Sequence, residues 1–202
     1  MLAAAGGFLD GFTYVGHGHV FANAMTGNVI VLGINCFTGS WHAGLRRVPA
    51  IVAFVLGVGV AQVIQVRARR RDVSVPYSGV LALEVAVLLA LSFLPAGTAD
   101  IIFTTSIAFA ASVQVQSFRE VDGHAFSSTF TTGNLRTLTE AAVDWSFGGR
   151  KTENASTVRD FSVICALFLI GAIAGGYATE RFGSHALWVD IVLLGFVIKW
   201  TR

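Results

Sequence analysis

The sequence predicts an all-α polytopic membrane protein that is built from two duplicated halves. Of its 202 residues, 54% are hydrophobic and only 13% are charged, and the mean hydropathy is +0.67. A water-soluble globule of this size needs more polar surface than such a composition supplies, which indicates a protein that is embedded in the lipid bilayer. A motif at residues 18–28 also returns about half a chain later, at residues 123–134, and an internal repeat of this kind decides the architecture.

Both copies of the motif read Gly-His-x-Phe, then a short run of small and polar residues, and then Thr-Gly-Asn. The second copy is one residue longer, so the match is a duplication with an insertion. The repeat also extends beyond the motif, because Glu84 and Asp190 lie in apolar segments and are separated by the same number of residues as Thr26 and Thr132. We therefore predict a single membrane domain, residues 1–202, with one repeat at about residues 1–95 and the other at about 96–202.

Taken in order, the first apolar segment is residues 1–16, which is short for a bilayer. At 1.5 Å per residue it covers roughly 24 Å of a ~30 Å hydrocarbon core. It has no basic n-region and Asp10 interrupts it, so no cleavable signal peptide is predicted. The first motif continues into residues 29–37, and the second into a helix that ends near residue 147, with a polar loop at 148–160. The full spanning candidates are residues 48–66, 77–94, 99–118, 161–178 and 186–199.

Glycines within two of these segments are expected to serve close helix packing rather than to act as hinges, because small residues let membrane helices approach one another. They are Gly57 and Gly59 in the first of the two, and Gly171, Gly175 and Gly176 in the second.

The charge distribution separates two topologies for the Thr-Gly-Asn segments. If each segment crosses the membrane, each half has four spans, and six basic residues on one face oppose seven on the other. If each segment enters and leaves on one side, each half has three spans and the halves are inverted. Ten basic residues then gather on one face and three on the other. The second arrangement obeys the positive-inside rule, so we prefer about six spans plus two short broken or re-entrant segments, with residues 67–71 in the cytoplasm.

Each Thr-Gly-Asn segment is expected to start a helix within the membrane. Ser, Thr, Asn and Gly disfavour helix interiors but suit helix starts, so the chain should turn there from extended to helical. Such a start directs unpaired backbone N–H groups and a positive dipole end at the occupant of the site, as in the discontinuous helices of secondary transporters. We therefore expect a substrate site near the bilayer midplane. Its candidate residues are Asn23, Thr26, Gly27, Asn28, Gln114, Gln116, Thr132, Gly133 and Asn134.

Three acidic residues in apolar segments, Asp10, Glu84 and Asp190, are candidates for coupling a proton or another ion. An acid within a span is costly unless it is paired or hydrated, so a structural ion pair is the alternative for Glu84 and Asp190. The partners considered for such a pair are Arg136, His19 and His124. Asp10 lies near a helix end, and its alternative is simply to reach the membrane interface.

Several classes of function find no signature. The 14 Lys and Arg residues lie mostly between apolar segments, so they indicate membrane orientation rather than binding to nucleic acid. Cys36 and Cys165 are interpreted as packing residues. No catalytic triad order, P-loop or dinucleotide fingerprint is present, so no enzymatic activity is predicted. His17, His19 and His124 lack the spacing of a closed metal site. A cluster of His17, His19 and Asp10 is the alternative that would bind a metal, but no metal or cofactor is predicted.

Residues 7–14 read Gly-Phe-Leu-Asp-Gly-Phe-Thr-Tyr, and residues 114–119 read Gln-Val-Gln-Ser-Phe-Arg. Together with the two Thr-Gly-Asn motifs, they resemble the YoaK family, a group of small bacterial multi-pass membrane proteins classed as a domain of unknown function. The resemblance covers nearly the whole chain. It implies a polytopic helical protein of the bacterial cytoplasmic (inner) membrane, and it supplies no substrate, activity or functional residue. Members of the family usually carry residues ahead of the first helix that this sequence lacks.

Three functions follow as hypotheses. The first is a secondary transporter or exporter of a small polar or anionic solute, in which the helix starts bind the solute and Glu84 or Asp190 couples a proton. The second is a non-transporting scaffold or assembly protein whose polar residues lock the helices together. The third is a passive channel. The expected partners are the lipid bilayer and a small solute, with a homo-oligomer left open.

Overall fold

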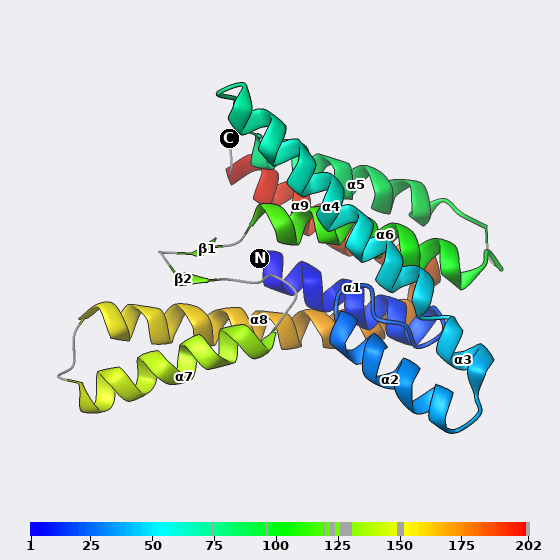
Figure 1. Ribbon diagram of the computed structural model, residues 1–202, viewed down its shortest axis with the longest axis horizontal. Coiled ribbons are helices and arrows are strands. Elements are labelled where there is room, and N and C mark those ends of the chain that lie inside the picture. Colours follow the sequence, from blue (N-terminus) through cyan, green and yellow to red (C-terminus); the bar gives the residue numbers. More distant parts are fainter. Residues whose placement is uncertain are drawn as a thin grey trace.

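The computed structural model describes residues 1–73, 75–95, 97–118, 120–121, 124–125, 131–148 and 152–200, and it describes side chains in all of these ranges except 120–121 and 124–125. Over these ranges the chain is almost entirely helical, which confirms the all-α prediction (Figure 1). The first half contains α1 (Leu2–Gly16), α2 (Met25–Phe37), α3 (Trp41–Leu45), α4 (Val48–Arg70) and α5 (Tyr77–Ser92). The second contains α6 (Asp100–Ser117), α7 (Thr131–Phe147), α8 (Thr152–Phe182), the 3-10 turn η1 (Gly183–Ala186) and α9 (Leu187–Trp200).

A two-residue hairpin follows α6, made of β1 (Glu120–Val121) and β2 (His124–Ala125). The strands are antiparallel, with Glu120 opposite Ala125 and Val121 opposite His124.

Most helix boundaries match the apolar segments, but α8 does not. It begins at Thr152, so the polar loop expected at residues 148–160 is wrong for residues 152–160. This stretch contains neither Gly nor Pro, and Glu153 is exposed while Thr157 is buried. Its polarity therefore belongs to the outer face of a helix that α7 covers on the other side.

Both Thr-Gly-Asn motifs lie in the first turn of a helix, as predicted. α2 begins at Met25 and α7 at Thr131, each one residue ahead of the motif threonine. The residue that precedes α2 is Ala24, which offers no side-chain cap. The N–H groups near this helix start therefore need partners from elsewhere in the fold.

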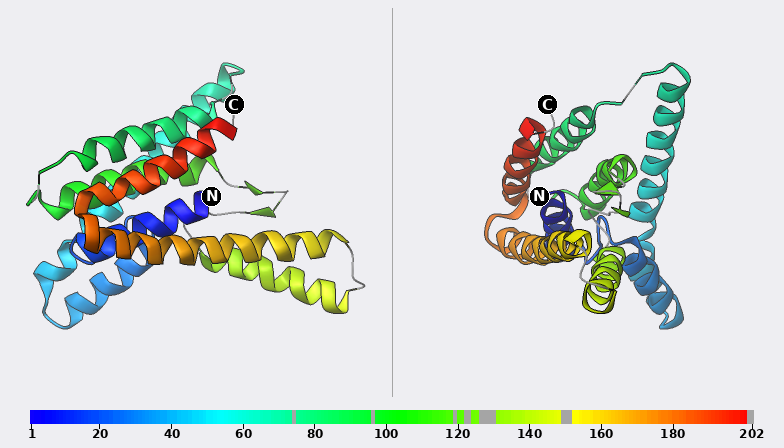
Figure 2. Two further views of the ribbon diagram at one scale, coloured as in Figure 1. Left: turned by 180° about the vertical axis from the view of Figure 1, so that it is seen from behind. Right: turned by 90° about the vertical axis from the view of Figure 1, so that its left-hand side faces the viewer.

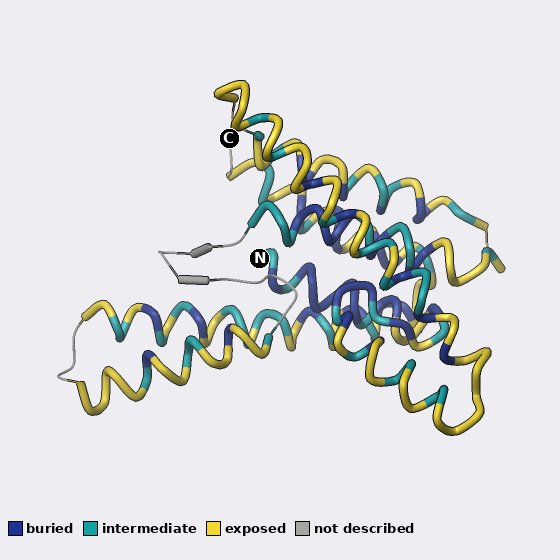
Figure 3. The backbone as a smooth tube through the Cα atoms, in the orientation of Figure 1, coloured by how far each residue is buried: buried dark blue, intermediate teal, exposed yellow. Residues whose placement is uncertain are grey.

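The helix α1 lies at the centre of the molecule, and Figure 3 shows that it contains the longest buried stretch. On one side it packs tightly against α8. A Cβ atom at Gly171 would overlap the carbonyl oxygen of Ala4, and one at Gly175 would overlap that of Phe8. These glycines therefore bring the two backbones into direct contact, which confirms the expectation that they serve packing.

A glycine contact of the same kind joins α4 to α6. A Cβ atom at Gly57 would lie 2.6 Å from the carbonyl oxygen of Phe109 and would overlap the hydroxyl of Ser112. Gly59, in contrast, meets no described atom within 4 Å, so the packing role expected for it is not found in the described part of the chain.

The main core fills the space between α1, α5, α6 and α9. Its fully buried side chains include Phe12 of α1, Leu81 and Leu88 of α5, Ile107 of α6 and Leu194 of α9. The end-on view in Figure 2 shows these helices gathered as a bundle. Figure 1 shows that α7 and the first part of α8 form a helical hairpin that projects beyond it. The polar cluster described below lies among the core helices.

The outer surface of the helices is apolar. Val55, Leu56 and Ile173 are each more than half exposed, and they lie on the longest helices. In the described part of the chain, two helical stretches are long and apolar enough to cross a membrane, Trp41–Arg70 and Thr152–Trp200. Met25–Phe37 and Tyr77–Ser92 are apolar but shorter. Together with the mean hydropathy, these surfaces are those of a membrane protein.

Candidate functional site

The loop at residues 17–24, between α1 and α2, folds back along α1. The Asp10 Oδ1 atom accepts hydrogen bonds from the backbone N–H groups of Asn23, at 2.7 Å, and Ala24, at 3.4 Å. The Thr13 hydroxyl accepts one from the N–H of Ala22 at 3.1 Å and donates to the carbonyl of Leu9 at 2.9 Å. Two side chains of α1 thus satisfy the N–H groups of the loop just before α2 and fix the position from which the helix begins.

The Thr-Gly-Asn motif holds this loop from the other side. The Asn28 Oδ1 atom accepts from the N–H of Phe21 at 3.0 Å, and its Nδ2 donates to the carbonyl of Phe21 at 2.7 Å. A Cβ atom at Gly27 would lie 3.0 Å from the ring of Phe21. The recurring phenylalanine, glycine and asparagine of the motif therefore form one contact: the glycine admits the ring and the asparagine clamps the backbone. Thr26 is exposed.

The second motif is described only in part. Thr132 and Gly133 are exposed in the first turn of α7, while Asn134 is buried. Gly123 and the residues from 126 to 130 lie outside the described residues, and so does the counterpart of the clamp on Phe21.

The structure brings Glu84, Gln114 and Asp190 together inside the bundle. All three are at most 1% exposed, and they come from α5, α6 and α9 respectively. The Gln114 Nε2 donates to Glu84 Oε2 at 2.8 Å, and Asp190 lies close enough to Glu84 to interact with its charge. Both carboxyl oxygens of Asp190 are buried without a hydrogen-bond partner among the described residues. The two acids that the sequence places at equivalent positions therefore lie near one another inside the bundle.

The structural ion pairs considered for these acids are not formed with Arg136 or His19. Arg136 bonds instead to Glu140 at 2.8 Å on the exposed face of α7. His19 is exposed and packs on Tyr14, with 5.1 Å between the ring centroids. The side chain of His124 lies outside the described residues.

Asp10 does not reach the interface, since it is only 4% exposed and holds the loop. Gln116 lies away from the acids, where its Nε2 donates to Gln62 Oε1 at 2.6 Å on an exposed part of α4 and α6. The structure therefore separates the predicted site residues into one group around Asp10 and another around Glu84.

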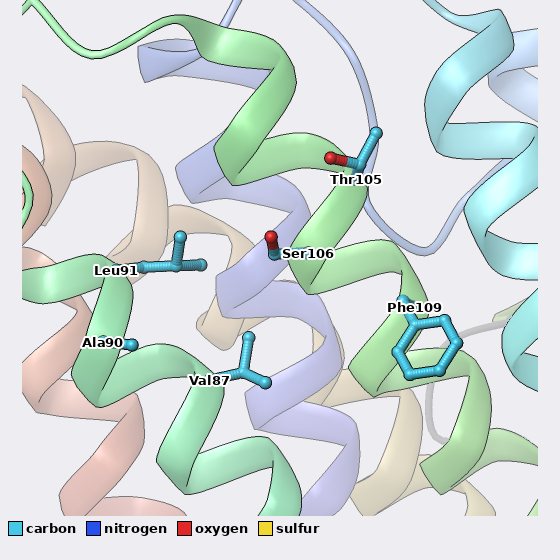
Figure 4. Close-up of a pocket in the computed structure, with 6 residues that line it drawn as sticks. All are labelled: Val87, Ala90, Leu91, Thr105, Ser106 and Phe109. Carbon is cyan, nitrogen blue, oxygen red and sulfur yellow. The ribbon is translucent and has the colours of Figure 1, made fainter.

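A cavity of about 420 Å³ lies between α5 and α6, and Figure 4 shows the six side chains that line it. Val87, Ala90 and Leu91 come from α5 and Thr105, Ser106 and Phe109 from α6. Val87 is three residues beyond Glu84 and so lies on the same face of α5, one turn along. The cavity is therefore mostly apolar, with two hydroxyl groups on one wall and the acidic cluster at the next turn.

A second cavity, of about 260 Å³, lies where α1 ends and α6 begins. His17 Nδ1 lies 3.2 Å from Asp100 Oδ1 there, and its ring stacks on Phe103 with 4.0 Å between centroids. Burial lowers the pKa of His17, while the hydrogen bond to Asp100 acts in the opposite direction. The lining residues are His17, Gly18, Val20, Arg46, Ala99, Asp100, Ile101 and Thr104.

Sequence reasoning missed three of the residues that shape these sites. Thr13 follows Asp10 by three positions, so helical spacing places both on one face of α1 and was a usable signal. Arg47 donates to the carbonyl of His19 at 3.1 Å, and Asp100 bonds to His17. Both of these contacts join residues far apart in the chain, so no local sequence pattern predicts them.

The comparisons with known proteins agree with the family resemblance that the motifs indicate. The family model described as "Protein of unknown function (DUF1275)" matches residues 1–200. The chain is 27% identical over 203 residues to the UPF0700 transmembrane protein YoaK of Bacillus subtilis (strain 168), a match that covers 96% of this chain and 88% of that protein. No solved structure matches. The resemblance inferred from the sequence is thereby confirmed, and the chain belongs to the DUF1275 family of proteins of unknown function.

Proposed function

We propose that this chain is a secondary transporter or exporter of a small polar or anionic solute in the bacterial cytoplasmic (inner) membrane, and that it acts by transport rather than by enzymatic chemistry. The observation that carries the proposal is the buried pair of Glu84 and Asp190, which lies among apolar helices. Ionisable groups at such a place are costly, and proteins retain them where a proton or a solute passes. Asp190 in particular keeps two oxygens for which no described residue is a hydrogen-bond partner.

The proposal includes two inverted repeats, at about residues 1–95 and 96–202, with six spans and two re-entrant half-helices. In it, α1, α2, α4 and α5 correspond to α6, α7, α8 and α9. The packing supports this correspondence, because α1 lies against α8, α6 lies against α4, and α5 lies against α9. An approximate two-fold relation between the halves produces this set of contacts.

The close helix contacts support the same correspondence. Gly171 of α8 meets the carbonyl of Ala4 on α1, and Gly57 of α4 meets the carbonyl of Phe109 on α6. Both contacts place a glycine against a backbone carbonyl, and the helix pairs correspond under the proposed repeat. The glycines themselves lie at different positions, because the separation that relates Thr26 to Thr132 pairs Gly57 with Val163. Inverted repeats with broken helices are a recurring architecture of secondary transporters.

The basic residues support the proposed orientation. The last turn of α4 carries Arg67, Arg69 and Arg70, and the last turn of α9 carries Lys199. These two helix ends lie towards the same end of the bundle in Figure 1. Arg46 and Arg47 immediately precede α4, and Arg181 lies in the last turn of α8. The start of α4 and the end of α8 both lie at the opposite end of the bundle. The first end faces the cytoplasm under the positive-inside rule.

We assign the solute to the cavity between α5 and α6, beside Glu84. The hydroxyl groups of Thr105 and Ser106 supply polar contacts there, and the acidic pair couples a proton. The starts of α2 and α7, with Thr26, Thr132 and Gly133 exposed and Gly27 half-buried, complete the proposed route. Asn23 and Asn28 contribute by holding the first half-helix in place.

A scaffold or assembly protein is the second candidate, and one observation favours it. Asn28, Thr13 and Asp10 all direct hydrogen bonds to the loop before α2, which is what residues that lock a fold do. On this alternative the protein moves no solute.

The test uses purified protein in liposomes that enclose a pH-sensitive dye, with a panel of small carboxylates, inorganic phosphate and amino acids added outside. A proton-coupled transporter changes the internal pH when its solute is supplied. Asp190→Asn and Glu84→Gln should abolish this change while the melting temperature is kept, and Glu153→Gln, at an exposed acid of α8, should leave it intact.

Two other results would assign another function. A solute that crosses only down its own gradient, without a pH change, indicates a channel. If no compound moves the internal pH and both acid variants melt at lower temperature, the scaffold is favoured.

A further inference from the structure

We propose that Asp10 is a proton-binding site, in which the neutral carboxyl donates a hydrogen bond from Oδ2 to the side-chain oxygen of Asn23 and so latches the loop at residues 17–24 to α1. The inference deepens the proposed function, on which it rests for its biological meaning, because it adds a second proton site and names this loop as the element that responds to the proton.

The first step of the argument is that two buried oxygen atoms lack donors. Asp10 and Asn23 are 4% and 0% exposed, and neither Asp10 Oδ2 nor Asn23 Oδ1 has a hydrogen-bond partner among the described residues. The other atoms of the two groups are engaged: Asp10 Oδ1 accepts from two N–H groups, and Asn23 Nδ2 donates to the carbonyl of Gly6 at 3.1 Å. A buried acceptor without a donor is costly, so two of them together require a cause.

The second step is that the two oxygens belong to neighbouring groups. The backbone N–H of Asn23 bonds to Asp10, and the side chain of Asn23 bonds to Gly6. Gly6 precedes Asp10 by four residues and therefore lies on the same face of α1, one turn earlier. The amide of Asn23 is thus laid along the face of α1 that carries the Asp10 carboxyl.

The third step excludes a rearrangement of the amide. If the Asn23 side chain turned over, its NH₂ group would point away from Gly6, and its oxygen would face the Gly6 carbonyl, which is also an acceptor. A single proton on Asp10 Oδ2 leaves every existing hydrogen bond in place and supplies the one donor that both oxygens need. It also removes a negative charge from a site enclosed by apolar helices.

The surrounding charges do not supply another partner among the described residues. The ionisable groups on the loop side are His17, His19 and Arg47, of which His17 bonds to Asp100 of α6 and Arg47 bonds to the carbonyl of His19. The face of α8 against α1 presents Phe168, Ala172 and Gly176. On α9 the buried ionisable group is Asp190.

Loss of the proton would leave a buried negative charge on the Asp10 carboxylate. The carboxylate could no longer donate to Asn23, and two acceptor oxygens would face one another without a proton between them. The loop and the start of α2, which depend on Asp10 for their N–H partners, would then be released or hydrated. Proton binding and the position of the re-entrant segment are in this way linked.

The test compares the wild type with Asp10→Asn in the full-length protein, by thermal unfolding across about pH 5 to pH 9. Asparagine reproduces the neutral carboxyl, since its NH₂ group donates to Asn23 while its oxygen accepts from the loop. A proton bound more tightly in the folded than in the unfolded state stabilises the fold at low pH, and this stability is lost as the pH rises. We therefore expect the variant to match the wild type at low pH and to melt at a higher temperature at high pH. His17 and the other groups are common to both proteins and cancel in the difference.

A second measurement starts from the wild type and does not depend on the folding of Asp10→Asn. The infrared spectrum of the wild type at neutral pH should contain the carbonyl band of a protonated carboxyl, and Asn23→Ala should move that band to higher frequency by removing its hydrogen bond. Glu84→Gln is the control, because it removes another buried carboxyl and should leave the shift caused by Asn23→Ala unchanged.

An Asp10→Asn protein that melts below the wild type by the same margin at every pH would overturn the proposal, because Asp10 would then act as a carboxylate, with a bridging water between the two oxygens. So would a carboxyl band that Asn23→Ala does not move. Neither measurement involves solute movement, so a failure of the latch and a failure of transport are distinguishable.

Discussion

Asn28 uses both ends of its side-chain amide on a single residue, since it accepts from the N–H of Phe21 and donates to its carbonyl. The amide therefore imitates a strand neighbour and holds an extended segment against the first turn of a helix. Only Asn or Gln carries a donor and an acceptor on one planar group, and Gln is longer by one carbon. This explains why an asparagine, rather than another polar residue, follows the glycine of the motif.

We expect Asn28→Ala to destabilise the folded protein by about 1 to 3 kcal/mol, because it removes the partners of both half-buried backbone groups of Phe21. The measurement is thermal unfolding of the detergent-purified protein. Thr26→Ala is the matched control, since Thr26 is exposed in the same helical turn, and its effect should stay within about 0.5 kcal/mol. Equal losses in the two variants would refute the clamp.

At this scale the sequence predicted which residues matter better than it predicted their contacts. The duplication singled out Asn28, Glu84 and Asp190, and all three are fully buried. It did not reveal that Asn28 hydrogen-bonds to Phe21, seven positions earlier, or that Asp10 accepts hydrogen bonds from N–H groups of the loop. Such contacts depend on the chain folding back, and a linear pattern carries no signal for the direction in which it folds.

Among the described helices, α1 and α8 form the most extensive contact, and glycines on both helices permit their close approach. Gly7 and Gly11 of α1 are one turn apart, and so are Gly171 and Gly175 of α8. Without a hydrophobic driving force between helices in lipid, close van der Waals packing of this kind supplies much of the association.

We expect Gly175→Ala to destabilise the protein by about 1 to 3 kcal/mol, because the new methyl group would overlap the backbone carbonyl of Phe8 and force α1 away from α8. Gly33→Ala is the control, since Gly33 is an exposed glycine inside α2 with no described atom within 4 Å of its Cβ position. That change should be neutral or stabilising by up to about 1 kcal/mol. Thermal unfolding of both variants measures the difference, and a Gly175→Ala protein as stable as the wild type would show that the helices have room to separate.

The apolar segments predicted the position of nearly every helix, but not the length of α8. A hydropathy window ends where charged residues begin, whereas a helix ends where its backbone loses support. Residues 152–160 remain helical because α7 packs alongside them and Phe161 and Thr157 are buried. Polarity along a segment thus indicates its environment more directly than its secondary structure.

For the molecule as a whole, the two topologies weighed from the sequence make opposite statements about three loops. With re-entrant segments, Asp72 and Ser146 share the cytoplasmic face and Ser40 lies on the other side. If the Thr-Gly-Asn segments cross fully, Ser40 and Ser146 share a face, and Asp72 lies opposite. All three residues are exposed and lie at the ends of helices.

We expect a membrane-impermeant maleimide to label Ser40→Cys in intact cells, but to label Asp72→Cys and Ser146→Cys only after the cells are made permeable. Each substitution is placed in a background in which Cys36 and Cys165 are changed to Ala, since these are the two native thiols. The background protein without a new cysteine is the control. Labelling of Ser146→Cys together with Ser40→Cys in intact cells would rule out the re-entrant arrangement.

The packing of α1 against α8 also bears on how the chain is made. α1 is synthesised before α2 to α7, yet the helix it packs against most extensively, α8, follows all of them in the chain. The glycine face of α1 must therefore stay covered by lipid or by the insertion machinery until α8 has been synthesised. The closest-packed contact of α1 is thus a late product of biogenesis, formed only after the intervening helices have been made.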